Sequence, residues 1–152
     1  MRRARRAPAV LLALLLSLAA LADGAPARPQ PILPADLAWT PSQKIPGLRS
    51  TWIVGSEQGS GPYLMRVELA AGTRIVPHRH PDHRATTVLR GTLYVGFGEA
   101  ADDAALVAIP EGAVYVAPAQ MPHFLWAKDG AVLYQENGLA PTGTEPVAAP
   151  PR

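Results

Sequence analysis

All four histidines of this chain lie in two short segments, and histidine is the side chain that most often binds transition metals in proteins. His78, His80 and His83 lie in the run PHRHPDHR, and His123 lies in the run PAQMPHF. Strand-like sequence surrounds both segments. This concentration predicts one metal site that uses all four imidazoles as ligands.

The spacing of these histidines suits convergence on one ion. His78 and His80 are two residues apart, and alternate side chains of an extended strand project from the same face. His83 follows Pro81, where the chain should bend, and His123 begins another apolar run much further along the chain. A β-barrel could bring two such segments to one interior point.

The elements that must position the histidines are short strands. Runs rich in Val, Ile, Leu and aromatic residues are separated by turn residues such as Arg90-Gly91 and Asp129-Gly130. In residues 63–69 the apolar side chains recur at period two, which is typical of a strand with one buried face. Many short strands predict an all-β sandwich or barrel. The expected strands are residues 51–55, 63–69, 73–77, 86–98, 105–109, 113–117, 122–127 and 131–137, with one helical turn allowed in the run EAADDAALVAI.

The two ends of the chain differ in composition from its middle. Residues 1–22 combine four arginines, an apolar run and a small-residue cleavage site, which is the layout of a secretory signal peptide. The apolar run is shorter than the roughly 20 residues that span a bilayer. We therefore expect export to the periplasm or the medium, with no stable membrane span after cleavage. Residues 23–35 are expected to be a proline-rich linker, residues 36–139 the folded domain and residues 140–152 a mostly disordered tail.

Charge and cysteine content narrow the function classes. The net charge of +2 comes from 14 basic and 12 acidic residues. Since four arginines lie in the leader, the rest of the chain has 14 − 4 = 10 basic and 12 acidic residues. Nucleic acid is therefore not expected as a partner. The chain has no cysteine, so a metal site must use nitrogen or oxygen ligands.

The first histidine segment resembles the first motif of the cupin family. The run GTRIVPHRHPDHRATTVLRG has a glycine, five residues, H-x-H, and a closing V-L-x-G. These positions are Gly72, His78, His80 and Gly91. The resemblance extends over residues 62–138 and implies a double-stranded β-helix, or jelly-roll, barrel with a metal inside one end.

The second segment resembles the second cupin motif. In the run EGAVYVAPAQMPHF, Gly112 is followed by five residues and Pro118, and His123 follows. Gln120 replaces the usual glycine and Ala127 the usual asparagine. The glycine replacement is tolerable if the turn needs no positive φ.

The first motif also departs from the family pattern, because it lacks the usual glutamate ligand. Asp82, His83 and Arg84 lie where that glutamate would fall. We expect His83 to replace it. The alternatives are that Asp82 replaces it, or that His83 faces solvent and three histidines bind. Neutral imidazoles leave the metal charge uncompensated, so the site should attract an anion. Arg84 is expected on the surface, with binding of an anionic substrate as the alternative.

The expected cofactor is one divalent transition metal, and imidazole ligands leave Fe, Zn, Ni, Mn and Cu open. Four further residues are weaker candidates for a substrate pocket, with core packing as the alternative for each. They are Met65, Tyr94, Leu125 and Gln135.

The resemblance implies several activities, since dioxygenases, isomerases, lyases and decarboxylases all occur on this barrel, and fold alone does not choose among them. The missing glutamate removes one candidate base. We therefore expect a metal-dependent, dioxygenase-like oxidoreductase that acts on a small oxygen-bearing molecule. The alternatives are a binding or sensing module that does not catalyse a reaction, and a purely structural metal. The resemblance also implies a homodimer.

Overall fold

The computed structural model describes residues 28–147. Contacts within the chain divide it into two units, Met1–Pro31 and Ile32–Arg152. The described residues of the first unit, 28–31, are exposed and have no regular secondary structure. The expected signal peptide lies outside the described residues. Within residues 28–147, no helix is long and apolar enough to cross a membrane.

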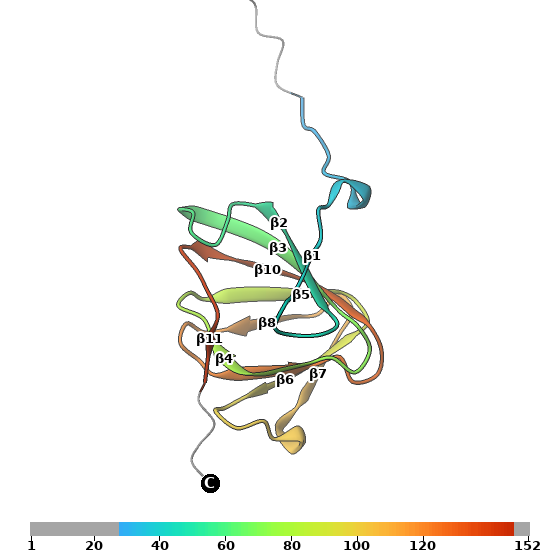
Figure 1. The fold of residues 1–152 in the computed structure, drawn as a ribbon, viewed down its shortest axis with the longest axis vertical. Helices are drawn as coiled ribbons and strands as arrows, with labels where there is room; N and C mark the ends of the chain where they lie inside the picture. Colours follow the sequence, from blue (N-terminus) through green and yellow to red (C-terminus); the bar gives the residue numbers. More distant parts are fainter. Residues whose placement is uncertain (1–27, 148–152) are drawn as a thin grey trace, which may run out of the picture. The chain divides into compact units, whose positions relative to one another are not determined.

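The second unit consists of two antiparallel sheets that face each other (Figure 1). One sheet has the order β1-β2-β3-β10-β5-β8 and the other the order β11-β4-β9-β6-β7. The all-β, jelly-roll prediction is confirmed. The strands are β1 (Thr40–Pro41), β2 (Leu48–Val54), β3 (Gly61–Leu69), β4 (Arg74–Arg79), β5 (Arg84–Arg90), β6 (Thr92–Phe97), β7 (Val107–Pro110), β8 (Val114–Ala117), β9 (His123–Trp126), β10 (Val132–Ala140) and β11 (Glu145–Pro146), with 3-10 turns η1 (Pro34–Asp36) and η2 (Asp103–Ala105).

The core lies between the two sheets and follows from the period-two pattern of the strands. Along β10, Val132, Tyr134 and Glu136 are buried while Leu133 and Gln135 are only half-buried. Burial of the apolar side chains stabilises the fold by about 25 cal/mol per Å² removed from water. The core residues are Val67, Leu69, Ile75, Val88, Leu93, Val95, Leu125, Ala127, Val132 and Tyr134.

One expected strand, residues 86–98, is divided by a tight turn at Gly91. β5 before the turn belongs to the six-stranded sheet, and β6 after it belongs to the five-stranded sheet. Gly91 has a φ of 83°, and a Cβ atom there would lie 2.6 Å from the carbonyl oxygen of Ala131. Glycine is therefore required at the point where the chain passes from one sheet to the other. The expected helical turn is present as η2, where the Asp102 side chain accepts from the Ala104 N–H.

The C-terminal segment differs from the disordered tail expected for residues 140–152. β11 pairs with β4, which sets Glu145 opposite Arg79 and Pro146 opposite His78. Thr142 is buried. The prolines do not prevent this order because β11 is an edge strand, where a missing N–H is tolerated. Residues 148–152 lie outside the described residues.

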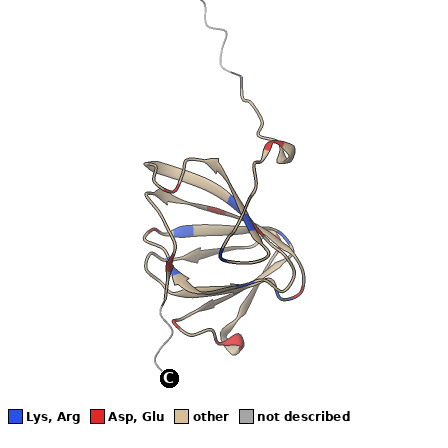
Figure 2. Cartoon of the chain, viewed as in Figure 1, with Lys and Arg blue, Asp and Glu red and all other residues tan. Residues whose placement is uncertain are grey.

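Basic and acidic residues are interspersed over the described ribbon rather than gathered by sign (Figure 2). Two of the pairs they form lie on the outer surface of the sheets, Arg49 with Glu68 and Arg74 with Asp103. Exposed pairs of this kind each contribute at most about 1 kcal/mol. The charges that matter for the site are buried ones.

Candidate metal centre

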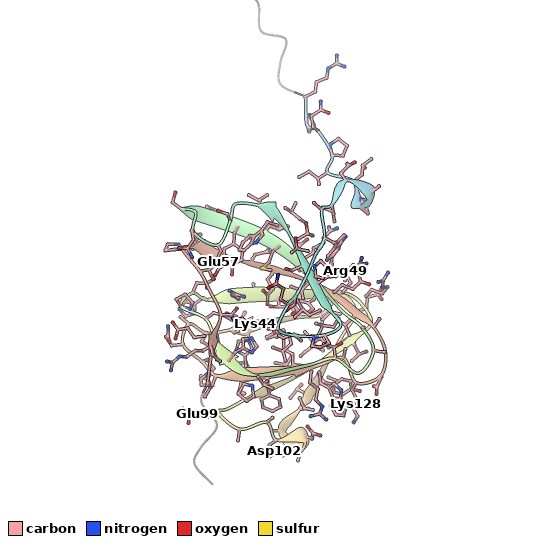
Figure 3. All side chains as sticks on the ribbon, viewed as in Figure 1. Lys44, Arg49, Glu57, Glu99, Asp102 and Lys128 are labelled. Atoms are coloured by element: carbon pink, nitrogen blue, oxygen red, sulfur yellow. The ribbon has the colours of Figure 1, made fainter. Side chains whose placement is uncertain are left out.

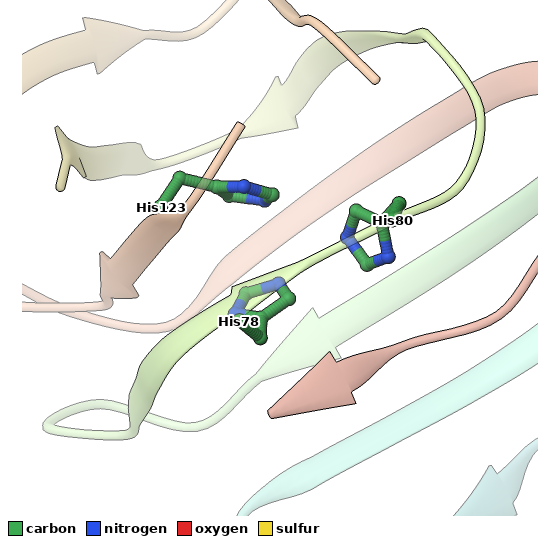
Figure 4. Close-up of side chains that lie close together, drawn as sticks. All are labelled: His78, His80 and His123. Carbon is green, nitrogen blue, oxygen red and sulfur yellow. The ribbon is translucent and has the colours of Figure 1, made fainter. Parts of the chain in front are cut away.

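The structure brings His78, His80 and His123 together at one end of the space between the sheets (Figure 4). His78 lies in β4, His80 directly follows that strand, and His123 is the first residue of β9. The register of β4 and β9 sets His78 opposite His123. All three side chains are buried, with exposed fractions of 6%, 3% and 1%.

The distances between the three imidazoles are those of a site close to metal-binding geometry. The ring centroids are separated by 4.3 to 5.1 Å. One ring nitrogen from each residue lies within 4.8 Å of the others. Two nitrogens bound to one ion at about 2.1 Å are at most about 4.2 Å apart. Small ring rotations are therefore enough to bring all three onto one ion.

Each of the three imidazoles is held by its Nδ1 atom. Nδ1 of His78 lies 2.9 Å from the carbonyl oxygen of Val76, and Nδ1 of His123 lies 3.0 Å from that of Met121. Nδ1 of His80 lies 2.7 Å from the carbonyl oxygen of Gly143. Because a carbonyl oxygen only accepts, each Nδ1 must carry the proton, which leaves the Nε2 lone pair for a metal. Nε2 of His80 is buried and has no hydrogen-bond partner.

The surroundings also keep the imidazoles neutral. Burial, followed by the nearby His123, lowers the pKa of His78 to about 4. Burial, followed by the charge of Arg84, lowers the pKa of His80 to about 2. The pKa of His123 is lowered mainly by burial. Since a metal binds the neutral ring, these groups are ready for a cation at neutral pH.

A cavity of about 440 Å³ opens beside His78 and His80. Met65 and Leu125, two of the four expected pocket residues, lie in its wall. The other two do not: Tyr94 donates to Asp129, and Gln135 accepts from Nε of Arg66 at 3.2 Å. The wall consists of Ser42, Lys44, Ile45, Leu48, Ser50, Met65, Val67, Ile75, Val76, His78, His80, Arg84, Leu125, Tyr134, Glu136, Thr144 and Pro146.

The sequence matches no protein-family model and no curated protein. The structure, however, is similar to solved structures. The polyketide cyclase RemF from Streptomyces resistomycificus is 12% identical, with a TM-score of 0.68 over 81% of this chain and 88% of that one. KdgF from Halomonas sp. is 16% identical, with a TM-score of 0.58 over 74% and 96%. A cupin-2 domain, Rru_A2000 from Rhodospirillum rubrum, is 18% identical, with a TM-score of 0.56 over 76% and 77%.

The chain has the cupin fold. The group of histidines that could hold a metal differs from the four-histidine site expected from the sequence, because His83 lies outside it. His83 is exposed, and its Nδ1 accepts from the N–H of Ala119 at 3.3 Å. Asp82 is engaged elsewhere as well, since its carboxylate accepts from the hydroxyls of Tyr63 and Thr142. The arrangement matches the third alternative, in which His83 faces solvent and three histidines could hold the metal.

The residue that points inward near His80 is Arg84, which was expected on the surface of the protein. Its side chain is 6% exposed. It donates from NH1 to Oε2 of Glu136 at 2.9 Å and from NH2 to Oγ1 of Thr142 at 2.8 Å. The alternation along β5 could have predicted this burial, because Arg84 shares its face with the apolar Val88.

Glu136 is the site residue that sequence reasoning missed. It lies two residues after Tyr134 on the inward face of β10, and both line the cavity. Burial raises the pKa of Glu136, and the neighbouring Arg84 opposes that shift. The cavity therefore contains a carboxyl group, although the candidate metal ligands are all histidines.

The turn before His123 does require a positive φ. Gln120 stands at the usual glycine position of the second motif and has a φ of 62°. The condition under which the glycine replacement would be free of strain is therefore not met. Gln120 adopts the strained conformation, and its N–H donates to the carbonyl oxygen of His80 at 2.8 Å. The turn thus connects the two histidine segments of the cupin motifs.

Proposed function

We propose that this cupin is a metal-dependent enzyme that acts on a small oxygen-bearing substrate. The observation that carries the proposal is the common orientation of three buried imidazoles, each held through Nδ1 by a backbone carbonyl. This support leaves the Nε2 lone pair of each ring for a metal, and His78 and His80 line the cavity. Sites with three protein ligands keep a coordination position for water or substrate, whereas structural sites are closed by four.

The residues present fit a divalent transition metal. His78, His80 and His123 would hold it, and imidazole donors suit iron, zinc, nickel and copper, with manganese as a further candidate. Such an ion supplies Lewis-acid activation of a bound oxygen atom, and redox chemistry if it is redox-active.

The residues that line the cavity determine which substrate it can bind. Apolar side chains such as Ile45, Leu48 and Met65 would contact an apolar body. The charged groups of the wall are Lys44 and Arg84 at +1 each and Glu136 at −1, and Asp82 next to Arg84 adds −1, a sum of 0. With a divalent ion the sum is +2, which favours an anionic substrate.

Two reaction types suit this site. A dioxygenase-like oxidation remains the first form of the proposal. The absence of a glutamate from the first motif favoured this oxidation, because it removed one candidate base. Glu136, however, places a carboxyl group in the cavity wall. That observation favours a second form, in which Glu136 moves a proton to or from the substrate as a lyase or isomerase requires. The likeness to RemF, a polyketide cyclase, supports an enzyme in general.

Export and self-association complete the proposal. Residues 1–22 direct the chain to the periplasm or the medium, and the domain forms a homodimer. N-terminal sequencing of the protein from a periplasmic fraction and light scattering of the purified protein test these two points. An uncleaved N-terminus or a monomeric mass would contradict the corresponding point.

The central test is metal content followed by turnover. Protein purified without a histidine tag is analysed by mass spectrometry for metals, then reloaded with each candidate ion. Oxygen consumption and product formation are measured with small diketones, phenols and hydroxy acids. We expect one ion per chain and turnover with one ion, both lost in His80→Ala and retained in His83→Ala, whose histidine lies outside the group. Metal without turnover, with a ligand-induced shift in melting, would indicate a binding module instead.

A further inference from the structure

We infer that residues 141–147, which we call the C-terminal strap, belong to the metal centre. The strap fixes the ring of His80 and closes the cavity. This inference rests on the proposed metal site. The strap runs from the end of β10 through β11 and lies across the end of the sheets that holds the histidines (Figure 1).

The three imidazoles differ in where their support comes from. His78 and His123 each bond to a carbonyl two residues earlier in their own segment, Val76 and Met121. His80 instead bonds to Gly143, which is 63 residues away in the sequence. The local strand conformation therefore orients two ligands, whereas the third is oriented only when the strap is in place.

The strap also fixes the charged side chain nearest to His80. Arg84 donates from NH2 to Oγ1 of Thr142 and to the carbonyl oxygen of Gly143, at 2.8 and 3.1 Å. The Thr142 hydroxyl donates in turn to Asp82. One buried threonine thus links Arg84 to Asp82, whose Oδ1 lies 3.6 Å from Nε of Arg84.

Backbone hydrogen bonds anchor the strap at both of its ends. The N–H of Thr142 donates to the carbonyl oxygen of Glu57, on the turn between β2 and β3 (Figure 3). The N–H of Val147 donates to the carbonyl oxygen of Pro77, next to His78. Between these anchors, Thr144 and Pro146 form part of the cavity wall. The strap is therefore both a support for a ligand and a surface that a bound substrate would contact.

The experiment uses the full chain with the Val147 anchor and the buried hydroxyl of Thr142 removed, in the variant Thr142→Val/Val147→Pro. Valine removes the buried hydroxyl, and proline removes the N–H that bonds to Pro77. Gly143→Ala is the matched control, because a Cβ there meets only Oε1 of Glu57 at 3.6 Å and the carbonyl stays in place. Thr51→Val is a second control, since Thr51 is also a buried threonine but lies on β2, outside the strap and the cavity wall.

The first readout is Co(II) binding, followed by its visible absorption spectrum. Loss of an outer hydrogen bond to a ligating histidine lowers metal affinity by about 10–100-fold. We expect a drop of this size in the double variant, together with a changed Co(II) spectrum that reports a changed geometry. Both controls should retain wild-type affinity and spectrum. Wild-type values in the folded double variant would overturn the inference.

The second readout needs no metal. Nitrogen-15 NMR of the imidazoles should find His80 as the Nδ1–H tautomer in the wild type and as a mixture in the double variant, with His78 and His123 unchanged. If the wild type binds no Co(II), the proposed function fails while this spectrum still decides the role of the strap. If the double variant does not fold, Thr142→Val alone is measured in the same way, and an unchanged His80 tautomer and Co(II) affinity would again overturn the inference.

Discussion

The two sheets contribute different chemistry to the cavity. The five-stranded sheet carries His78 on β4 and His123 on β9, both buried and neutral. The six-stranded sheet carries Arg84 on β5 and Glu136 on β10, both buried and paired at 2.9 Å. We call the side with His78 and His123 the neutral wall and the side with Arg84 and Glu136 the charged wall. The imidazoles of the neutral wall keep Nε2 lone pairs that can bind a cation, whereas the ionic groups of the charged wall pair with each other. The difference fits the proposed function, in which the histidines bind the metal while the Arg84–Glu136 pair sets the charge of the site and supplies a carboxyl group.

The two walls should respond to acid in opposite directions. Unfolded histidine takes up a proton near pH 6.5, but His78 in the folded protein does so only near pH 4. Stability of the metal-free protein is therefore full above pH 6.5 and falls below it, by about 1.4 kcal/mol per pH unit for each neutral histidine. His80 and His123 add to this loss. Glu136 acts the other way, because a raised carboxyl pKa favours the folded state as pH falls.

Urea unfolding of the metal-free protein between pH 7 and 4.5 measures the net effect. We expect a steep loss of stability, since three histidines outweigh one carboxyl group. His78→Ala should show a slope shallower by about 1 kcal/mol per pH unit. A free energy of unfolding that does not change over this range would contradict the prediction that the three histidines are neutral in the folded protein.

The charged wall is tested by removing one member of its pair. Arg84→Met leaves Glu136 and Asp82 buried without their cation, and breaking a buried pair in this way lowers the free energy of unfolding by about 3–5 kcal/mol. Urea unfolding at pH 7 measures the loss. Arg84→Met/Glu136→Met is the control and should recover much of it. A loss below about 1 kcal/mol in the single variant would mean that the pair is not a stabilising unit.

The neutral wall is tested by the effect of metal on stability. An ion present at 100 times its Kd stabilises the folded state by about 2.7 kcal/mol. We expect His78→Ala to lose this gain, and His83→Ala to keep it because His83 is exposed. Thermal melting with and without added Zn(II) measures both. An equal gain in His78→Ala would remove that residue from the ligand set.

The same contrast explains what the sequence could predict. The strands and the inward direction of His78 and His80 follow from period-two patterns, which are local. The same local rule could have placed Arg84 and Glu136 inward, from their spacing to Val88 and Tyr134. Their pairing could not be predicted, because it joins residues 52 positions apart.

The strap shows the physical limit more clearly. Its sequence is rich in proline and poor in large apolar groups, which is typical of a disordered tail. What orders it is a set of hydrogen bonds to Glu57, Pro77 and His80, all distant in the sequence. Composition reports the capacity of a segment to bury apolar surface, and it does not report hydrogen-bond partners supplied by a fold already formed.

The smallest expected effect concerns the turn that connects the two walls, between β8 and β9. Gln120 has a φ of 62° there, and this conformation disfavours a residue with a Cβ by about 1–2 kcal/mol. Glycine removes that strain, but it also gives the unfolded chain more freedom, by about 0.5–1 kcal/mol. Gln120→Gly should therefore raise the free energy of unfolding by up to about 1 kcal/mol. Gln120→Ala keeps the Cβ and should give no gain, so the difference between the two variants in urea unfolding isolates the backbone. If Gln120→Gly and Gln120→Ala have the same free energy of unfolding, the turn is not strained. The hydrogen bond from the N–H of residue 120 to the carbonyl of His80 then forms without a backbone penalty.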